Sequence, residues 1–151
     1  METADAEVAA RFRRVIGRLS RRLNASAIEE GLTPSQASAL ATIAWRGPLS
    51  LADLTKVEGL NPTMVSRIVG RLDQLALIRR IPNPDDMRAA VVEITEEGNA
   101  MHLRIREERA RVFTRYLERL SEGERRAIVE ALPALDALAD RLDEGQPPIR
   151  Q

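Results

Sequence analysis

The chain has 151 residues, of which 44% are apolar and 30% charged, a composition typical of a globular domain. There is no run of 18 uncharged apolar residues, which argues against a transmembrane helix, and the charged N-terminus lacks a signal-peptide core, so we expect a cytoplasmic protein. The absence of cysteine excludes disulfides and thiolate metal sites, and a net charge of zero argues against non-specific nucleic-acid binding.

A first amphipathic helix is expected from about Ala6 to Ile28. Its apolar residues recur at helical spacing as Val8, Phe12, Val15, Ile16, Leu19 and Leu23. Arginines cover much of the remaining surface of this segment. The pattern predicts a helix that buries one stripe of its surface.

A second helix is expected to begin after Thr33. The letters TPSQ combine a threonine that can cap the helix, Pro34 at the first helical position, and Gln36 to complete a capping box. The helix should end before the letters RGP. Leu49 follows as a candidate for a short strand.

The segment SLADLTKVEGLNP predicts a short helix, a turn and the start of a longer helix. Ser50 can cap the short helix with Asp53 at its third position. Gly59 should end it, because a tight turn there favours a residue that adopts a positive φ angle. Asn61 can cap the next helix and Pro62 can start it. This arrangement is a helix-turn-helix.

The hydrophobic period then changes from helical to alternating. The letters LALIRRIP and RAAVVEIT read as two strands, and the intervening letters PNPDDM are rich in turn formers. The two strands therefore predict a β-hairpin. A hairpin directly after a helix-turn-helix is the wing of a winged helix.

The last third of the chain is predicted to be helical. Thr95 can cap a long helix from about Glu96 to Leu120, and the letters SEGE form a second capping box for a helix to about Leu142. Pro133 lies inside that last helix and is expected to kink it. Residues 143–151 are expected to form a frayed tail.

In this order, the elements resemble the MarR family of transcription factors. The resemblance covers residues 8–142 and is carried by the letters GPLSLADL, NPTMVSRIVGRLDQLALIRR, NPDDMRAAVVEITEEG and LSEGERR. It implies a mainly α fold with a small β-hairpin wing, in one domain over residues 1–151. The DNA-binding lobe would span residues 34–95, and dimerisation helices would span 6–28 and 96–142.

Two residues depart from the family pattern. Met87 stands where the family often has arginine, which concerns one phosphate contact at the wing tip. Ala76 stands where a glycine commonly ends the recognition helix, which predicts a less sharp exit from that helix.

The resemblance implies an obligate homodimer, and the apolar stripes of the first and last helices point the same way. A small winged helix cannot cover both stripes, whereas intertwining with a second copy would. The alternative is that these helices fold back onto the core of a single chain. A two-fold dimer would place two recognition helices on the half-sites of a pseudo-palindromic operator.

The predicted recognition helix has one polar face. At 100° per residue, Thr63, Ser66, Arg67, Gly70 and Arg71 fall opposite Val65, Ile68, Val69 and Leu72. Arg67 is the best candidate for a bidentate contact with guanine. The full set of predicted DNA-binding residues is Ser50, Asn61, Pro62, Thr63, Met64, Ser66, Arg67, Arg71, Asp86 and Arg88. The alternative is a solvated helix face.

In the wing, the resemblance implies that Arg88 enters the minor groove of DNA. Asp86 lies two residues earlier and could hold the guanidinium in place. The alternative is an exposed pair on a turn, which would contribute no more than about 1 kcal/mol.

The resemblance also implies a response to small aromatic or phenolic compounds. In this chain the helix pattern would place such a ligand near Phe12, Ile16, Ala41, Trp45, His102, Ile105 and Arg109. The alternative is that Trp45 and Phe12 are ordinary core residues.

The expected function is therefore a sequence-specific DNA-binding regulator, a repressor released by a small ligand. The alternative is a winged-helix protein-interaction module without specific DNA binding. An enzyme is disfavoured because His102 is the only histidine and because no Gly-rich phosphate loop or serine elbow is present. No cofactor or metal is expected.

Overall fold

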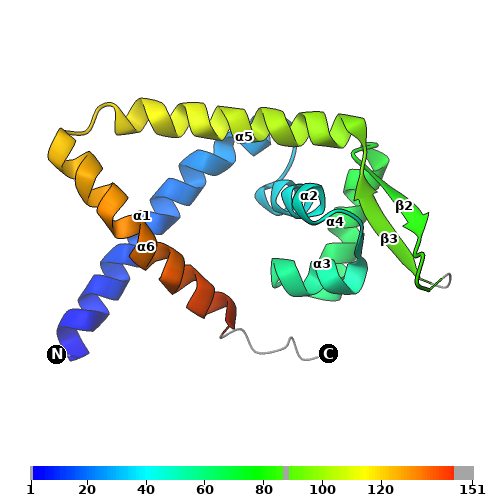
Figure 1. Cartoon of the computed structure of the whole chain (residues 1–151), viewed down its shortest axis with the longest axis horizontal. Helices are drawn as coiled ribbons and strands as arrows, with labels where there is room; N and C mark the ends of the chain where they lie inside the picture. The colour runs from blue at the N-terminus through cyan, green and yellow to red at the C-terminus, as the bar shows by residue number, and fades with distance from the viewer. Residues whose placement is uncertain (1, 87–88, 145–151) are drawn as a thin grey trace.

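The computed structural model describes residues 2–86 and 89–144 and is mainly helical, with one small sheet (Figure 1). Its elements in chain order are α1 (Glu2–Glu29), α2 (Pro34–Arg46), β1 (Leu49–Ser50), α3 (Leu51–Glu58), α4 (Pro62–Gln74), β2 (Ile78–Pro82), β3 (Ala90–Ile94), α5 (Glu96–Leu117) and α6 (Glu122–Glu144). The long helix α5 joins two regions (Figure 1). One contains α2, α3, α4 and the strands, and the other contains α1 and α6. We call the first the lobe and the helices α1 and α6 the arms.

The predicted elements are confirmed, with shifts at their ends. α1 begins at Glu2, four residues before the predicted start. α5 ends at Leu117 and not at Leu120, because the amide of Arg119 bonds to the carbonyl of Tyr116 in a tighter turn. α6 continues to Glu144, which makes the first two residues of the predicted tail helical, and residues 145–151 lie outside the described residues. Pro133 lies inside α6, which is one continuous helix across it.

The sheet has three antiparallel strands in the order β1-β3-β2. The predicted hairpin pairs Ile78 with Ile94 and Pro82 with Ala90. Leu49 forms a strand, as expected, and pairs with Val92, so β1 ties the entry of the helix-turn-helix to the wing. The strict alternation expected for β3 is wrong, because Val91 and Val92 are both buried.

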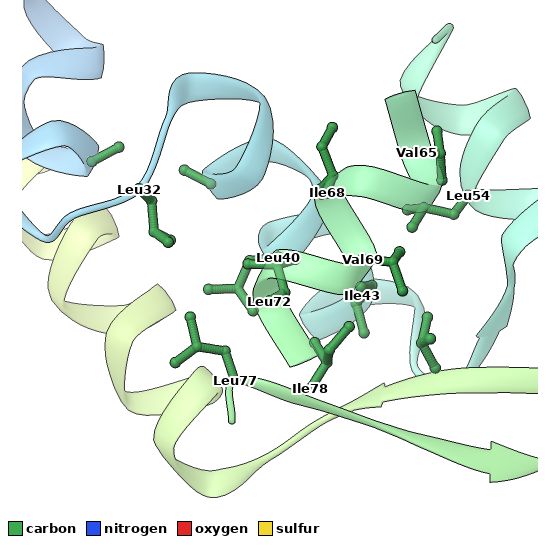
Figure 2. Packing of buried hydrophobic residues seen from close by; sticks show 14 of the residues in the cluster. Leu32, Leu40, Ile43, Leu54, Val65, Ile68, Val69, Leu72, Leu77 and Ile78 are labelled. Atoms are coloured by element: carbon green, nitrogen blue, oxygen red, sulfur yellow. The ribbon is translucent and has the colours of Figure 1, made fainter. Parts of the chain in front are cut away.

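The hydrophobic core belongs mainly to the lobe. Figure 2 shows leucines, isoleucines and valines from α2, α3, α4 and β2 pointing toward one another. Leu40 and Ile43 from α2 meet Leu54 from α3 and Leu72 from α4 in one buried cluster. Full burial of each such side chain contributes about 1.5–3 kcal/mol. These side chains fix the position of α4 within the lobe.

The arms leave their apolar stripes exposed. More than a third of each residue's surface is accessible at Val8, Phe12, Val15, Ile16 and Leu19 on α1 and at Ile128, Val129, Leu132, Leu138 and Leu142 on α6. α1 packs against α5 and α2, but α6 takes part in none of the principal contacts between described elements. The alternative in which both arms fold back onto a single core is therefore wrong.

The exit of α4 is sharp, so the expectation of a less sharp exit at Ala76 is wrong. Ala76 has a φ angle of 57°, the left-handed conformation that glycine usually supplies. The amide of Leu77 donates to the carbonyl of Leu72 at 3.0 Å, and that of Ala76 donates to Asp73 at 2.9 Å. These two bonds form a Schellman motif, which ends the helix with alanine in place of glycine.

Candidate nucleic-acid interface

Side-chain caps set the bounds of α3 and α4. The Ser50 Oγ accepts a hydrogen bond from the amide of Asp53 at 3.1 Å and donates one to its Oδ2 at 2.8 Å. Gly59 ends α3 with a φ angle of 62°. The Asn61 Oδ1 then accepts from the amide of Met64 at 2.8 Å, and Pro62 occupies the first helical position. Ser50 and Asn61 therefore have a structural role in starting the two helices.

The phase predicted for α4 is confirmed. Val65, Ile68, Val69 and Leu72 are buried, whereas Thr63, Met64, Ser66, Arg67 and Arg71 are exposed. Gly70 lies between the arginines, and a Cβ added there would meet no atom within 4 Å. The exposed face is therefore slender as well as polar, a shape that fits the major groove of DNA.

The charges around α4 favour DNA binding by its exposed face. Residues 46–95 contain seven basic and six acidic side chains, a net charge of +1. Asp53 bonds to Ser50, Glu58 accepts from the Thr42 hydroxyl at 2.6 Å, and Glu93 pairs with Arg79 across the hairpin. Asp73 lies 3.8 Å from Arg80 of β2.

Asp53, Glu58, Asp73 and Glu93 therefore already have partners. Among the ion pairs of the described residues, none involves Arg67 or Arg71.

The wing is described up to Asp86 and again from Ala89. The Asn83 Oδ1 accepts from the amide of Asp85 at 3.0 Å, and the amide of Asn83 donates to the carbonyl of Ala89 at 2.9 Å. Asp86 is exposed, and its carbonyl accepts from the amide of Ala89 at 3.0 Å. Arg88 and Met87 lie outside the described residues. The predicted pairing of Asp86 with Arg88 stays a prediction.

A second feature is a hollow of about 310 Å³ between α2 and α5. It is lined by Ala37, Ala41, Trp45, His102, Ile105, Arg106 and Arg109, which include five of the seven predicted ligand residues. The other two, Phe12 and Ile16, lie on α1 and do not line it.

The idea that Trp45 is a plain core residue is wrong. The residue is 71% exposed, and the Arg106 guanidinium lies 5.8 Å from the centre of its ring. Phe12 is 37% exposed and is not part of the core cluster either.

The hollow is positively charged on its α5 side. Burial and then the nearby charges of Arg106 and Arg109 lower the pKa of His102. The Arg109 Nε donates to the carbonyl of Leu23 at 3.1 Å, which ties α5 to α1. The lowered pKa favours the neutral form of His102, so an incoming ligand meets an uncharged imidazole and two guanidinium groups along α5.

Sequence reasoning missed Arg106 as a lining residue. The signal was available, because Arg106 follows His102 by four positions and precedes Arg109 by three, which places all three on one helix face. The sequence signals for two ion pairs were weaker, since Arg79–Glu93 depends on the register of the hairpin and Asp73–Arg80 on how the chain turns from α4 into β2. No group of three or more potential metal ligands comes together among the described residues. None of the described helices is long and apolar enough to cross a membrane.

Comparison with known proteins supports the assignment of this fold. The model of the MarR family matches residues 32–90. A relative from Mycobacterium bovis, the uncharacterized HTH-type transcriptional regulator Mb0904, is 29% identical over 140 residues, which are 93% of this chain and 98% of the relative. The HTH-type transcriptional repressor MdtR of Bacillus subtilis is 30% identical over 96 residues, covering 64% of this chain and 62% of MdtR.

A solved structure matches over nearly the whole length. The crystal structure of RV1404 from Mycobacterium tuberculosis superposes with a TM-score of 0.74 at 28% identity, over 97% of this chain and 95% of that chain. The match includes the arms as well as the lobe. With its capped helix-turn-helix, exposed polar α4 face and hairpin wing, the segment 32–90 is a MarR-family winged helix-turn-helix domain, and the chain resembles an HTH-type transcriptional regulator over 93% of its length, which supports a DNA-binding regulator.

Proposed function

We propose that this protein is a homodimeric repressor that binds a pseudo-palindromic operator and leaves it when a small aromatic anion binds. The observation that carries the proposal is the pairing of a slender polar face on α4 with arms whose apolar stripes have no cover in the single chain. The repressor name of the relative MdtR supports the direction of regulation.

The arms have the features of a dimer interface. Their exposed apolar side chains form long stripes, and large exposed apolar surfaces mark interaction sites. Residues 8–28 of α1 carry six arginines and no acidic residue, whereas α6 carries seven acidic residues and three arginines. A second copy would cover the stripes and bring opposite charges together. Two-fold symmetry then gives two recognition helices about one turn of DNA apart.

In this dimer α4 lies in the major groove. Arg67 contacts a guanine through two hydrogen bonds, Thr63, Met64 and Ser66 contact a thymine methyl or phosphates, and Arg71 contacts phosphate. Asn61, Pro62 and Ser50 place backbone amides at the helix starts near the DNA backbone. At the wing, Arg88 enters the minor groove with Asp86 holding its guanidinium.

The hollow beside Trp45 is the proposed ligand site. A tryptophan ring, a neutral imidazole and two guanidinium groups suit an aromatic carboxylate or phenolate. Titration of Trp45 fluorescence with salicylate and benzoate tests the site, since Trp45 is the only tryptophan. We expect quenching that Arg106→Ala weakens and that Arg125→Ala, on α6, leaves unchanged. Absence of any spectral change with either acid would contradict the ligand part of the proposal.

Selection of bound sequences from random duplex DNA tests the regulatory function. We expect a palindromic consensus, with the half-site spacing of a dimer, and sedimentation at twice the chain mass. A dimer that enriches no sequence would favour the alternative of a protein-interaction module. A monomer that enriches a single half-site would contradict the dimeric arrangement but would still support sequence-specific DNA binding.

A further inference from the structure

The exit of the recognition helix is joined directly to the start of α5. The Thr95 Oγ1 donates a hydrogen bond to the carbonyl of Ala76 at 2.7 Å, and the Thr95 amide donates to the carbonyl of Leu77 at 3.0 Å. The same Oγ1 accepts from the amide of Gly98 at 3.0 Å. We call these residues, 76–77 and 95–98, the α4–α5 joint. A single hydroxyl thus caps α5 and ties it to α4.

The two backbones of the joint are in direct contact. A Cβ added at Gly98 would lie 1.9 Å from the Leu77 carbonyl oxygen and 2.8 Å from its carbonyl carbon. Both Leu77 and Gly98 are buried. Because the neighbour is backbone and not a flexible side chain, the first turn of α5 cannot shift toward α4.

The joint also holds a strained residue. Ala76 occupies the left-handed region, with a φ angle of 57°, which is sterically unfavourable for residues other than glycine. The bond from Thr95 fixes the carbonyl of this residue, and the Schellman bonds fix its amide. Such a conformation persists only where its surroundings determine it.

We infer that Thr95 is a positioning residue for DNA binding, because its hydroxyl fixes the angle between α5 and the recognition helix. The inference rests on the proposed dimeric function, in which the arms form the interface. The far end of α5 leads into the arm α6 (Figure 1). α5 has 22 residues and is about 33 Å long, so a tilt of about 6° at the joint moves its far end by about 3.5 Å. This is about the rise of one base pair along DNA. A loose joint would therefore widen the range of distances between the two recognition helices of the dimer.

The capping role and the linking role of Thr95 can be separated by substitution. Thr95→Asp keeps an N-cap acceptor for the Gly98 amide but has no hydroxyl proton for Ala76, and Thr95→Ser keeps both functions. Ser121→Asp is the matched control, because Ser121 caps α6 through Glu124 and is not part of the joint. If Thr95→Asp does not fold, Thr95→Val, which loses both functions, is compared with Ser121→Ala, which loses a helix cap outside the joint.

The chain has no cysteine, so Gln74→Cys on the exposed end of α4 provides a single site for a spin label. The distance between the two labels of a dimer is then measured by pulsed electron resonance without DNA. We expect a narrow distribution in the parent, Thr95→Ser and Ser121→Asp, and a broad one in Thr95→Asp. In operator binding, Thr95→Asp should lose the preference for the selected spacing over one longer by a base pair.

A distribution for Thr95→Asp as narrow as that for Ser121→Asp, with the spacing preference kept, would overturn the positioning role and leave Thr95 as a helix cap. A parent protein that gives no label-to-label distance, or that binds no operator, would instead overturn the proposed dimeric function on which the inference rests. Failure of the positioning role would thus appear in Thr95→Asp, whereas failure of the dimeric function would appear in the parent protein.

Discussion

The lobe and the arms of this protein are built from similar helices but differ in whether their apolar side chains are buried within the chain. In the lobe, α2, α3, α4 and the sheet close a core in which Leu40, Ile43 and Leu72 have no exposed surface. In the arms, Leu132 is 47% exposed and Val8 is 67% exposed. A helix with an apolar stripe thus forms in both regions, but the structure provides cover for the stripe in only one.

The two regions therefore contribute to different properties: the lobe to the stability of each chain, and the arms to the association of two chains. Side chains of the lobe core stabilise the fold of each chain, whereas side chains of the arm stripes can gain their burial energy only from a partner. Substitutions in the two regions should therefore be distinguished by how their effects depend on protein concentration.

The largest effect on the fold is expected for Leu72→Ala. Removing this fully buried side chain from α4 should lower the free energy of unfolding by about 2–5 kcal/mol at every protein concentration. Urea unfolding followed by circular dichroism at several concentrations measures this. Leu132→Ala on α6 is the matched control and should shift unfolding most at low concentration. A similar, concentration-independent loss in both variants would remove the distinction between lobe and arms.

Leu132→Asp should break the dimer and spare the lobe. Covering a carboxylate inside an apolar interface is costly, so the dimer dissociation constant should rise by about 100-fold or more. Sedimentation velocity measures it. Ala134→Asp adds the same charge about 200° around the helix and should have little effect. An unchanged dimer in Leu132→Asp would place the interface elsewhere.

Arg67→Ala should weaken operator binding by about 1–3 kcal/mol and flatten the preference at one base pair per half-site. Fold and dimer should persist, because the side chain is exposed. Fluorescence anisotropy with single-base operator variants measures both effects. Arg79→Ala is the control, because Arg79 already pairs with Glu93 on the hairpin. Unfolding of Arg67→Ala would show that the arginine has a structural role.

Ala76→Gly should stabilise the lobe by up to about 1 kcal/mol. Glycine adopts a positive φ angle without strain, although its greater freedom in the unfolded chain offsets part of the gain. Gly98→Ala should act with the opposite sign, since its Cβ would overlap the Leu77 carbonyl. Differential scanning calorimetry compares the melting temperatures. A lower melting temperature for Ala76→Gly would argue against strain at this position.

The smallest effect concerns His102. Its pKa in the folded protein is lowered by burial and then by Arg106 and Arg109, so below pH 6.5 the unfolded chain binds more protons than the folded one. Stability therefore falls as pH falls through this window, and His102→Gln should remove that part of the loss. Between pH 8 and pH 5.5, the melting temperature of the parent should fall further than that of His102→Gln. A pH-independent difference would contradict this.

The candidate site was predictable where its signals are local. The caps at Ser50, Asn61 and Thr95 are predictable because each side chain bonds to the backbone amide three positions later. The exposed and buried faces of α4 follow from the fixed rotation of a helix. Both were confirmed, because neither depends on parts of the chain that are distant in sequence.

Other features depended on contacts between distant segments. The sequence could not show that Trp45 is exposed beneath Arg106, since an aromatic residue on an amphipathic helix usually packs inside. The effect of Ala76 was misjudged for a similar reason. Local propensity disfavours a left-handed alanine, and the bond from Thr95, nineteen residues later, belongs to the tertiary structure.

By itself, the sequence determined the order of the helices and strands, the polar face of α4 and the apolar stripes of the arms. These follow from residue type and period, which act over a few positions along the chain. The tertiary structure alone decided which stripes are covered, where the hollow lies, and how α5 meets the recognition helix. Those features arise from packing and from backbone contacts between segments far apart in sequence, such as Gly98 against Leu77, which no local pattern encodes.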